Sequence, residues 1–572
     1  MLTGALLTPC NVYTGLKIGW TFNMSVAAGL IGFAVWTFAA RLTNTRSWDL
    51  HENNINQTAA SAAASIISAG LAAPIPALAL LTGQTLALHV LSAWLLVVSL
   101  LGVIVAAGLR NQLLVRERLP FPSGVVTAET MSEIHQGGEE AHARLRLLAL
   151  TASASAALKA IVTSYGTTPV APAIKGTLTT ASGKLLNVTP TNLGFALDPS
   201  VLMVGFGAIA GLRIGISILI GGVLGWGVLA PIAVSNQWVQ PGTPGSVWFA
   251  PLVEWLLWPG ATLMVTASLT AFLISLVRVI TRKHHNVGDE QTADTTAREM
   301  SIDVRALAGA FAVVLVLAVL AQTMIFAIGL FEAVLAVALS YVLAIVAARV
   351  SGETAITPIG ALGKITQLTF GAISPGQVAT NLMTANVTGG AAGQCADLMH
   401  DLRTGQLIGA TPAFQIIAQV FGILTGAWVA AFTYLTLIPS PATQLITPEW
   451  PAPAVATWKA VAEVLSEGLS TMPPGAKEAI VVASIAGIAL AILESMAPQA
   501  YLKFIPSAPA MGLGFVIPAW NAISMFAGAL AAAVFVWIFP DLARKRLVVI
   551  AAGLIVGESL TGVAAALWSI FS

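Results

Sequence analysis

The chain has 572 residues, of which 57% are hydrophobic and only 9% are charged, and its formal net charge is +1. Soluble globular proteins carry about 25% charged residues, so this composition excludes an ordinary soluble enzyme. The near-neutral charge balance argues against nucleic-acid binding, and two cysteines, Cys10 and Cys395, are too few for a disulfide framework.

Long apolar runs predict an all-α polytopic membrane protein. About 20 apolar residues cross the hydrocarbon core as a helix. The predicted membrane helices lie near residues 18–40, 54–73, 85–109, 147–165, 198–235, 251–280, 306–326, 328–348, 411–438, 478–496, 508–539 and 547–571. Segments 120–138, 352–375 and 376–400 are interrupted by Gly or Pro and are too polar to face lipid, so we expect broken or re-entrant helices inside the protein.

Basic residues and a long polar stretch predict how the chain is divided and oriented. We expect an N-terminal membrane repeat over 1–280, a cytoplasmic polar linker over 281–305 and a C-terminal membrane repeat over 306–572. The positive-inside rule places three basic clusters in the cytoplasm. These clusters are Arg110, Arg116 and Arg118; Arg278, Arg282 and Lys283; and Arg544, Lys545 and Arg546.

Two internal echoes support a duplication. Residues 198–222 align without gaps on 505–529, with identical residues at seven positions, and 54–64 align more weakly on 384–394. Chance matching of Gly-rich helices is the alternative. Paired halves with broken helices are typical of secondary transporters.

The segment HENNINQTAASAAASIISAG at 51–70 is unusually polar for a membrane helix. Helical spacing gives it two polar stripes. They are Asn53, Asn56 and Gln57 on one side, and Asn54, Thr58, Ser61, Ser65 and Ser68 on the other. Amides donate and accept hydrogen bonds, so we predict that Asn53, Asn56, Gln57 and Thr58 bind a peptide-like substrate; a helix-packing interface is the alternative. Glu52 is a candidate proton acceptor or helix-end charge.

The segment FPSGVVTAETMSEIH at 121–135 predicts a half-helix that begins at Pro122. Its first residues, Ser123 and Gly124, are expected to leave free N–H groups that attract a substrate carboxylate. Glu129, Glu133 and His135 follow as a candidate proton-titrating cluster. A solvated amphipathic helix at the cytoplasmic edge is the alternative.

The segment GQCADLMHDLRTG places Asp397, His400 and Asp401 on one predicted helical face, near Cys395. These residues match no closed zinc pattern, so a cavity wall or cytoplasmic gate is favoured and no metal or cofactor is expected. Isolated charges in apolar runs are normally paired inside the bundle. They are Lys17, Lys159, Arg213, Glu254, Glu332, Lys364, Glu494 and Glu558; we predict Lys17 at the gate and Glu558 in proton coupling.

Several runs together resemble the oligopeptide transporter family, which includes the yellow-stripe-like metal-chelate carriers. The runs are ENNINQT at 52–58, FPSGVVTAETMSEIH at 121–135 and NLMTANVTGGAAGQCADLMHDLRTGQLIGATP at 381–412, with shorter likenesses at 11–32 and 556–562. The resemblance implies about sixteen membrane segments arising from duplication. It also implies proton-coupled uptake of small peptides, glutathione-like thiols or metal chelates, here by a bacterial member in the inner (plasma) membrane.

We therefore predict a proton-coupled secondary transporter that imports small oligopeptides or peptide-like compounds. Metal–siderophore or metal–amino-acid chelates are alternative substrates, and an intramembrane enzyme around residues 395–401 or a passive channel are alternatives of other classes. The expected partners are substrate, protons and the lipid bilayer, with a homo-oligomer left open. Because the weaker echo pairs their segments, Asn381, Asn386 and Gln394 are expected to bind substrate beside the amides of 51–70, around one cavity. No phosphate-binding loop or HExxH motif occurs.

Overall fold

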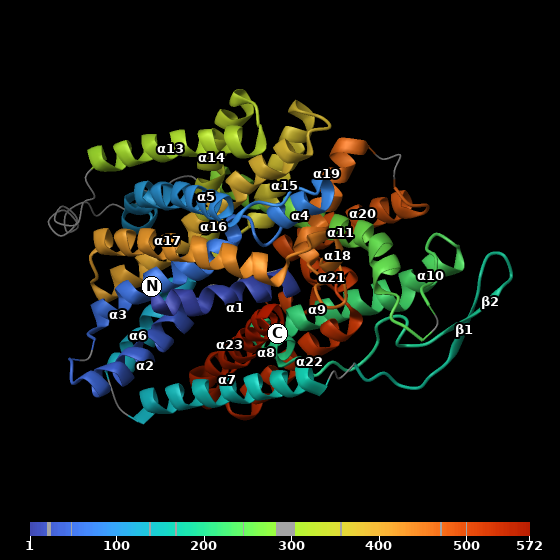
Figure 1. Ribbon diagram of the computed structural model, residues 1–572, viewed down its shortest axis with the longest axis horizontal. Coiled ribbons are helices and arrows are strands. Elements are labelled where there is room, and N and C mark those ends of the chain that lie inside the picture. The colour runs from blue at the N-terminus through green and yellow to red at the C-terminus, as the bar shows by residue number, and fades with distance from the viewer. Residues whose placement is uncertain are drawn as a thin grey trace.

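The computed structural model describes residues 1–19, 24–46, 48–136, 139–165, 169–243, 245–281, 304–354, 357–468, 472–498 and 500–571. These residues form a large assembly of helices with one two-stranded hairpin (Figure 1). Eleven of the described helices are long and apolar enough to cross a membrane, and three shorter apolar helices accompany them. The protein is thus an all-α polytopic membrane protein, as predicted; the figure of sixteen segments stays a prediction.

The first half of the chain contains short and broken helices between longer ones. Its elements are α1 (Leu2–Ile18), α2 (Ser25–Thr43), α3 (Leu50–Ser65), η1 (Ile66–Ala69), α4 (Pro74–Thr82), α5 (Leu88–Arg110), η2 (Asn111–Arg116), α6 (Pro122–His135), α7 (Glu139–Tyr165), β1 (Gly176–Thr179), β2 (Leu185–Val188), α8 (Val201–Ala210), α9 (Leu212–Gly222), η3 (Val223–Leu229), α10 (Ala230–Ser235) and α11 (Phe249–Thr281).

The second half has the same mixture of lengths. Its elements are α13 (Val304–Phe326), α14 (Leu330–Thr354), α15 (Ile359–Ile373), α16 (Val378–Ile408), α17 (Pro412–Leu437), α18 (Pro441–Gln444), α19 (Pro453–Glu467), α20 (Ala476–Met496), η5 (Leu502–Phe504), α21 (Ala508–Val516), α22 (Ala519–Ile538) and α23 (Pro540–Phe571). Most of the predicted linker 281–305 lies outside the described residues.

Helix α16 lies at the centre of the fold. It packs against α3, α5, α6, α14, α15 and α17, and most of its 31 residues are buried. Its Gly, Ala and Thr side chains are small, so neighbouring backbones approach closely, as is common between membrane helices. At Gly390, a side chain would collide with Val98 of α5 and with Ala69. This packing holds a polar helix away from lipid.

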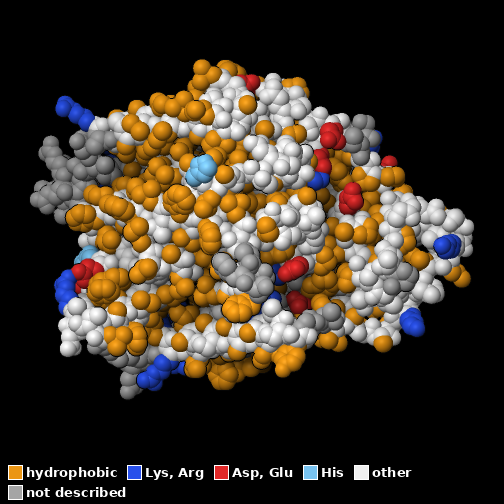
Figure 2. All heavy atoms as spheres, in the orientation of Figure 1, with side chains coloured by type: hydrophobic (Ala, Val, Ile, Leu, Met, Phe, Trp, Pro, Cys, Tyr) orange, Lys and Arg blue, Asp and Glu red, His pale blue; other side chains and the backbone are white. Residues whose placement is uncertain are grey.

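Helices α7, α13 and α20 have mostly exposed apolar faces. In the most apolar 18-residue stretch of each helix, only 11%, 28% and 17% of the residues are buried, respectively. Hydrophobic side chains cover much of the face drawn in Figure 2, with charged side chains toward its left and right ends and a few acidic ones near its centre. Such an apolar surface suits contact with lipid tails.

The two echoing segments pack against each other reciprocally. Gly207 of α8 lies against the backbone of Met525, and Gly514 of α21 lies against that of Ile218. Gly207 and Gly514 are 307 positions apart in the sequence, and so are Ile218 and Met525. If a two-fold axis relates the two segments, each contact must occur a second time with the partners exchanged. These exchanged contacts therefore support a repeat.

The hairpin between α7 and α8 was not anticipated. Strand β1 pairs with β2 in antiparallel register, with Gly176 opposite Val188 and Thr179 opposite Leu185. It projects from the right end of the molecule in Figure 1. Leu178, Leu186 and Val188 pack against the cluster formed with α10 and α11, so the hairpin is anchored from one side.

Candidate functional site

A cavity of about 290 Å³ lies where several broken helices meet. This volume is at the lower end of the range typical of small-molecule sites. Four helices, α4, α15, α19 and α21, begin at its wall. The cavity is lined by Ile18, Gly19, Ser68, Ala72, Ala73, Pro74, Met264, Val265, Ser268, Thr357, Ile359, Gly360, Lys364, Asn386, Gly389, Gly390, Pro453, Ala454, Thr457, Trp458, Pro509 and Leu513.

The helix breaks that form this wall have local causes. Gly70 has φ +143°, a conformation that favours glycine, and it separates η1 from α4. Ala452 has φ 43°, and Pro453 then begins α19 with a ring that suits the first helical position. Phe121 (φ 44°) and Pro122 start α6 in the same way.

Lys364 is the cation of the cavity wall, and its side chain is held from two sides. Its Nζ donates to Gln367 Oε1 at 2.8 Å and lies 4.3 Å from the ring centroid of Trp458. Gln367 Nε2 donates to Asn381 Oδ1 at 3.0 Å, and Asn381 Nδ2 donates to Gln367 O at 2.6 Å. Lys364 is only 3% exposed, and none of the ion pairs in the described part of the chain includes it.

Asn386 also lines the cavity, and its amide is fixed by two hydrogen bonds. Trp94 Nε1 donates to Asn386 Oδ1 at 2.7 Å, and Asn386 Nδ2 donates to Ala69 O at 2.8 Å. The second bond connects α16 to η1 at the point where the chain of α3 and α4 is broken. Asn386 therefore maintains the shape of the wall more than it offers free hydrogen-bonding groups.

The charge arrangement of the cavity suits an anion. The first turns of helices carry partial positive charge and unpaired N–H groups. Four such starts share the wall with the Lys364 ammonium, while Trp458 and Met264 add apolar surface. The arrangement fits a small molecule with a carboxylate at one end and an apolar or flat part beside it.

Of the six amides expected around one cavity, Asn386 alone lines this cavity, and the part of the other five in substrate binding stays a prediction. Asn381 contacts Gln367, which in turn accepts a hydrogen bond from Lys364. Gln394 is buried beside Gly102 of α5. The amides of α3 point elsewhere because α3 ends before the cavity and its polar faces meet α2, α16 and α17.

The amides of α3 make separate contacts. Asn53 Nδ2 donates to Gly29 O at 3.2 Å, and Asn56 Oδ1 accepts from Thr3 Oγ1 at 3.2 Å. Thr58 Oγ1 accepts from Gln415 Nε2 at 3.4 Å. These contacts join α3 to α1, α2 and α17, which is the helix-packing role considered for this segment.

A second polar network surrounds Asp401 on α16. Its Oδ1 accepts from Gln57 Nε2 at 2.6 Å and from Ser25 Oγ at 2.8 Å. Ser25 Oγ lies 2.9 Å from Ser61 Oγ. Asp401 is fully buried, and its Oδ2 has no hydrogen-bond partner among the described residues. The carboxylate is thus held on one side and open on the other.

The predicted common face of Asp397, His400 and Asp401 is divided between two neighbours. Asp397 interacts with Ser65 of α3, next to the Asp401 network. His400 Nε2 instead lies 2.9 Å from Ser351 Oγ of α14, and its ring packs edge-on against Phe121 at 5.3 Å. The described residues contain no group of three or more His, Cys, Asp and Glu side chains that could hold a metal.

The start of α6 lies against protein, and one of the two N–H groups expected to be free, that of Gly124, is paired. The Gly124 N–H donates to Phe121 O at 2.9 Å, and Gly124 packs against the backbone of His400, so this helix start is occupied by protein. Ser123 lies beside it and does not line the cavity. Helix α6 packs along α16, and the binding role of Ser123 and Gly124 stays a prediction.

The acidic groups of α6 lie toward the surface. Glu129 is exposed, and Glu133 forms an ion pair with Arg144 at 2.7 Å. The Nδ1 of His135 lies 2.9 Å from Met131 O, and its ring contacts Phe33. Their proposed part in proton coupling stays a prediction, but no shared cluster is formed by these three side chains.

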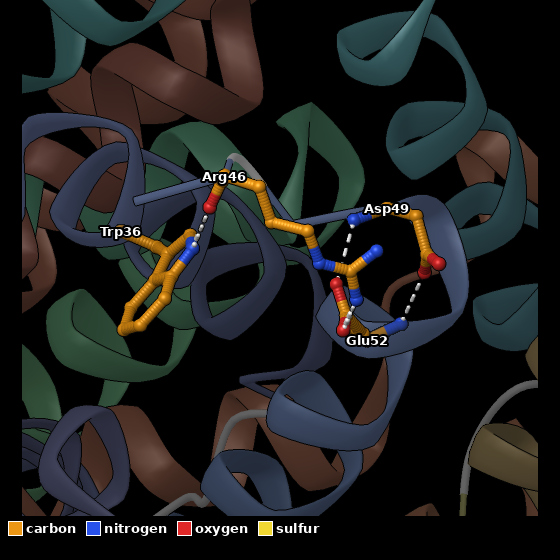
Figure 3. A network of polar contacts seen from close by, with 4 residues as sticks. All are labelled: Trp36, Arg46, Asp49 and Glu52. Atoms are coloured by element: carbon orange, nitrogen blue, oxygen red, sulfur yellow. Dashed lines mark hydrogen bonds and ion pairs between the residues drawn. The ribbon is translucent and has the colours of Figure 1, made fainter. Parts of the chain in front are cut away.

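Glu52 takes the helix-end role that was considered for it. It forms an ion pair with Arg46 and a capping box with Asp49, in which Glu52 N donates to Asp49 Oδ1 at 2.8 Å and Asp49 N donates to Glu52 Oε2 at 3.0 Å (Figure 3). Trp36 Nε1 donates to Arg46 O at 3.2 Å and so ties the same loop to α2. This network closes the polar end of α3.

Replacing Asp49 with Ala should loosen the first turn of α3 by about 1 kcal/mol, since an N-cap is removed. The hydrogen bond from the Glu52 N–H lowers the pKa of Asp49. Its contribution is therefore complete above the ordinary value of about 3.9 and is lost as the pH falls through the lower folded value. Hydrogen exchange of the α3 amides should show faster exchange in the variant; equal exchange in variant and wild type would contradict the capping role.

Neither Glu558 nor Lys17 lines the cavity. Glu558 is buried on α23 and caps α8, because Ser200 Oγ donates to Oε1 at 2.8 Å and Leu202 N donates to Oε2 at 2.7 Å. Lys17 Nζ lies 5.3 Å from the ring centroid of Tyr13, immediately before Ile18 and Gly19 of the wall. The coupling role of Glu558 and the gating role of Lys17 stay predictions.

Sequence reasoning did not select Lys364, Gln367 or Trp458 as site residues. Lys364 appeared there only as one of eight isolated charges in apolar runs. The available signal was its place in 352–375, a segment too polar and too interrupted to face lipid, where a buried cation needs a partner. A single cation in a segment that is expected to lie inside the protein is thus the sequence feature that indicates this site.

Comparison with known proteins places these features in a family context. The family model described as OPT oligopeptide transporter protein matches residues 1–569. A putative oligopeptide transporter of Saccharomyces cerevisiae is 26% identical, over 98% of this chain and 93% of its own length. A probable metal-nicotianamine transporter of Oryza sativa subsp. japonica is 26% identical over 95% and 81%, and the iron-phytosiderophore transporter yellow stripe 1 of Zea mays is 28% identical over 81% and 70%.

Proposed function

Because the chain belongs to the OPT oligopeptide transporter family, we propose that it is a proton-coupled secondary transporter that imports small oligopeptides or peptide-like compounds. Members of this family are transporters, so an intramembrane enzyme is no longer an alternative. We also propose that the protein lies in the inner (plasma) membrane with its basic clusters facing the cytoplasm.

The observation that carries the substrate proposal is the cavity cation. Lys364 is buried against Trp458 and lines the cavity together with the starts of α4, α15, α19 and α21. A buried cation is costly unless a partner compensates it, and a substrate carboxylate is such a partner. Every unmodified peptide supplies one at its C-terminus.

Metal chelates are the alternative substrates. Two relatives are described as a metal-nicotianamine transporter and an iron-phytosiderophore transporter, and a chelator of amino-acid type also presents carboxylates. Because a chelated metal arrives with its ligands, a cavity without a His or Cys cluster is compatible with either class. Both substrate classes therefore share the carboxylate that Lys364 would receive.

For the transport cycle we propose two repeats that rock around the cavity. The reciprocal contacts of Gly207 and Gly514 with Met525 and Ile218 support a two-fold relation between α8–α9 and α21–α22. Helices α4, α15 and α19 are broken or begin at the cavity, as in transporters that open alternately to either side. Superposition of 198–235 on 508–539 tests the relation; unrelated positions in the two halves would contradict it.

Uptake into proteoliposomes tests the transport proposal. The purified protein is reconstituted, an acidic exterior is imposed, and accumulation of labelled di- and tripeptides is compared with that of metal-loaded and metal-free amino-acid chelators. We expect one carboxylate-bearing class to accumulate above its external concentration and to leave again when a protonophore is added. Accumulation of the metal-loaded chelator alone would select the alternative substrate, and mere equilibration of every compound would contradict an active carrier.

A further inference from the structure

We propose that Asp401 and Asp397 form the proton-binding site of this protein and that the continuous segment α3–η1, which carries Ser61, Ser65 and Ser68, joins the site to the substrate cavity. The proposal rests on the proton coupling proposed above and names the residues that perform it. It replaces the surface carboxylates Glu52 and Glu129, which sequence reasoning favoured.

The first argument is the environment of Asp401. Gln57 and Ser25 donate to Oδ1, whereas the buried Oδ2 has no hydrogen-bond partner in the described part of the chain. Ser25 has one hydroxyl hydrogen. If Ser25 gives that hydrogen to Asp401, it accepts one from Ser61 at 2.9 Å, so the hydroxyl pair is oriented toward the carboxylate. The bonded side fixes the group, and the other oxygen is the place where a proton is added.

The second argument is the absence of a neutralising cation. None of the ion pairs in the described ranges includes Asp401 or Asp397. Among the described residues, the hydrogen-bonding partners of Asp401 on these neighbouring elements are uncharged: α2 contributes Ser25, and α17 contributes Gln415 to the Asp401 carbonyl oxygen, while His400 faces α14. His51 and Glu52 lie in the first turn of α3, before Gln57, and Glu52 is paired with Arg46. The charged neighbour that does act on Asp401 is Asp397.

Two carboxylates one helical turn apart, with no cation between them, favour a shared proton. Residues i and i+4 of a helix are neighbours on one face, and two negative charges so placed oppose each other. Adding a proton relieves this repulsion and lowers the cost of burying Asp401. Asp397 is less buried than Asp401, which gives the pair an inner and an outer member.

The third argument is the connection to the cavity. Ser61, Ser65 and Ser68 follow one another along α3 and η1: Ser65 Oγ donates to Ser61 O at 2.7 Å, and Ser68 Oγ donates to Ser65 O at 2.7 Å. Ser61 adjoins Ser25 of the Asp401 network, Ser65 lies beside Asp397, and Ser68 lines the cavity. Ser65 and Ser68 are thus tied to the backbone of the same segment, so a change in the contacts of Asp401 reaches the cavity wall through the packing of α3 and η1.

A consequence for the transport cycle follows from this connection. One proton from the acidic side converts the Asp397–Asp401 pair from two carboxylates to a carboxylate and a carboxylic acid. The change alters which hydrogen bonds Gln57 and Ser25 make, and these residues join α16 to α3 and α2. Because η1 continues α3 into the cavity wall, proton binding and substrate binding act on the same packed element.

The test compares Asp401→Asn and Asp397→Asn with Glu478→Gln, which changes an exposed carboxylate at the start of α20. Proteoliposomes carry a difference of one pH unit, which for one proton per substrate supports about tenfold accumulation. We expect wild type and Glu478→Gln to approach that level and both Asp variants to stop near equal concentrations inside and outside. Counterflow exchange of substrate at symmetric pH should persist in the Asp variants, because it needs no net proton movement.

A second readout separates a coupling role from a structural one. Substrate-driven acidification of the vesicle interior, followed with a trapped pH dye, should disappear in Asp401→Asn while exchange persists. Ser25→Ala keeps the carboxylate but removes one donor, so it should move the pH midpoint of uptake upward. If the Asp variants fail to fold, the Ser25→Ala profile alone decides; an unchanged profile in a folded Ser25→Ala protein overturns the proposal.

A failure of the proton-coupled function and a failure of the assignment to Asp397 and Asp401 give different results. If wild type exchanges substrate but a pH difference never drives accumulation, or a sodium gradient drives it instead, the proton-coupled function fails and this site with it. If wild type is driven by protons and both Asp variants accumulate normally with the wild-type pH dependence, only the assignment to Asp397 and Asp401 is wrong. Loss of accumulation in Glu129→Gln together with normal Asp variants would return the role to α6.

Discussion

Replacing Lys364 with Gln is expected to weaken binding of a carboxylate-bearing substrate by about 30-fold or more, which corresponds to roughly 2 kcal/mol. The ammonium is buried in the cavity wall and oriented by Gln367 and Trp458. A charge-assisted hydrogen bond in such a place is stronger than one in water. Gln keeps a polar end of similar length but cannot supply the positive charge. Binding of labelled substrate to purified protein measures the effect.

Two controls isolate the charge of Lys364. Lys459→Gln changes a neighbouring lysine on α19 that is paired with Glu463 and does not line the cavity, so affinity should stay within about twofold of wild type, as expected for a partly exposed ion pair. A peptide with an amidated C-terminus lacks the carboxylate, so it should bind weakly to wild type and lose little more in Lys364→Gln. Equal losses for the free and the amidated peptide would contradict the assignment of Lys364 to the carboxylate.

Replacing Gly422 with Leu is expected to prevent correct assembly of the helix bundle. Gly422 and Gly426 of α17 lie directly against the backbone of Ala59 and Ala63 of α3. A side chain at Gly422 would collide with the Ala59 carbonyl oxygen, which cannot move without displacing α3. Overpacking typically costs about 1–3 kcal/mol, and a backbone collision places this variant at the upper end or above it.

The assembly of the Gly422→Leu variant is measured as the yield and thermal midpoint of monodisperse protein in detergent. Leu424→Phe is the matched control, because it adds bulk on the exposed side of the same helix. We expect the control to behave as wild type and Gly422→Leu to be recovered in low yield or to unfold at a clearly lower temperature. A stable, monodisperse Gly422→Leu protein would show that α17 does not need to approach α3 so closely.

The positions of particular residues show what kind of information the sequence contained. The stripe of Asn54, Thr58, Ser61, Ser65 and Ser68 was predicted from helical spacing, and α3 presents Thr58 to α17 and Ser61 to α2. Spacing within one helix is a local property, so it is available from the sequence. The partner of each group is not local: Gln57 meets Asp401, which is 344 residues away.

The same distinction applies to the helix starts at the site. Ser123 and Gly124 have the composition of an anion-binding helix start, and Pro453 has it as well, but only the latter lies in the cavity wall. Both helices begin with proline after a residue with positive φ. Their local chemistry is alike, and they differ in what packs over them, because α6 is covered by α16.

By itself the sequence determined that this protein is an all-α polytopic membrane protein, since apolar runs of membrane-spanning length and scarce charge follow from composition alone. It also marked which segments are too polar to face lipid. Only the tertiary structure decided that Lys364 lines the cavity, that Asp401 meets Gln57 and Ser25, and that the amides of α3 are separated from Asn386. The reason is physical: burial and hydrogen-bond partners depend on how helices cross, and crossings are set by close contacts such as those of Gly390 and Gly422 between segments far apart in the chain.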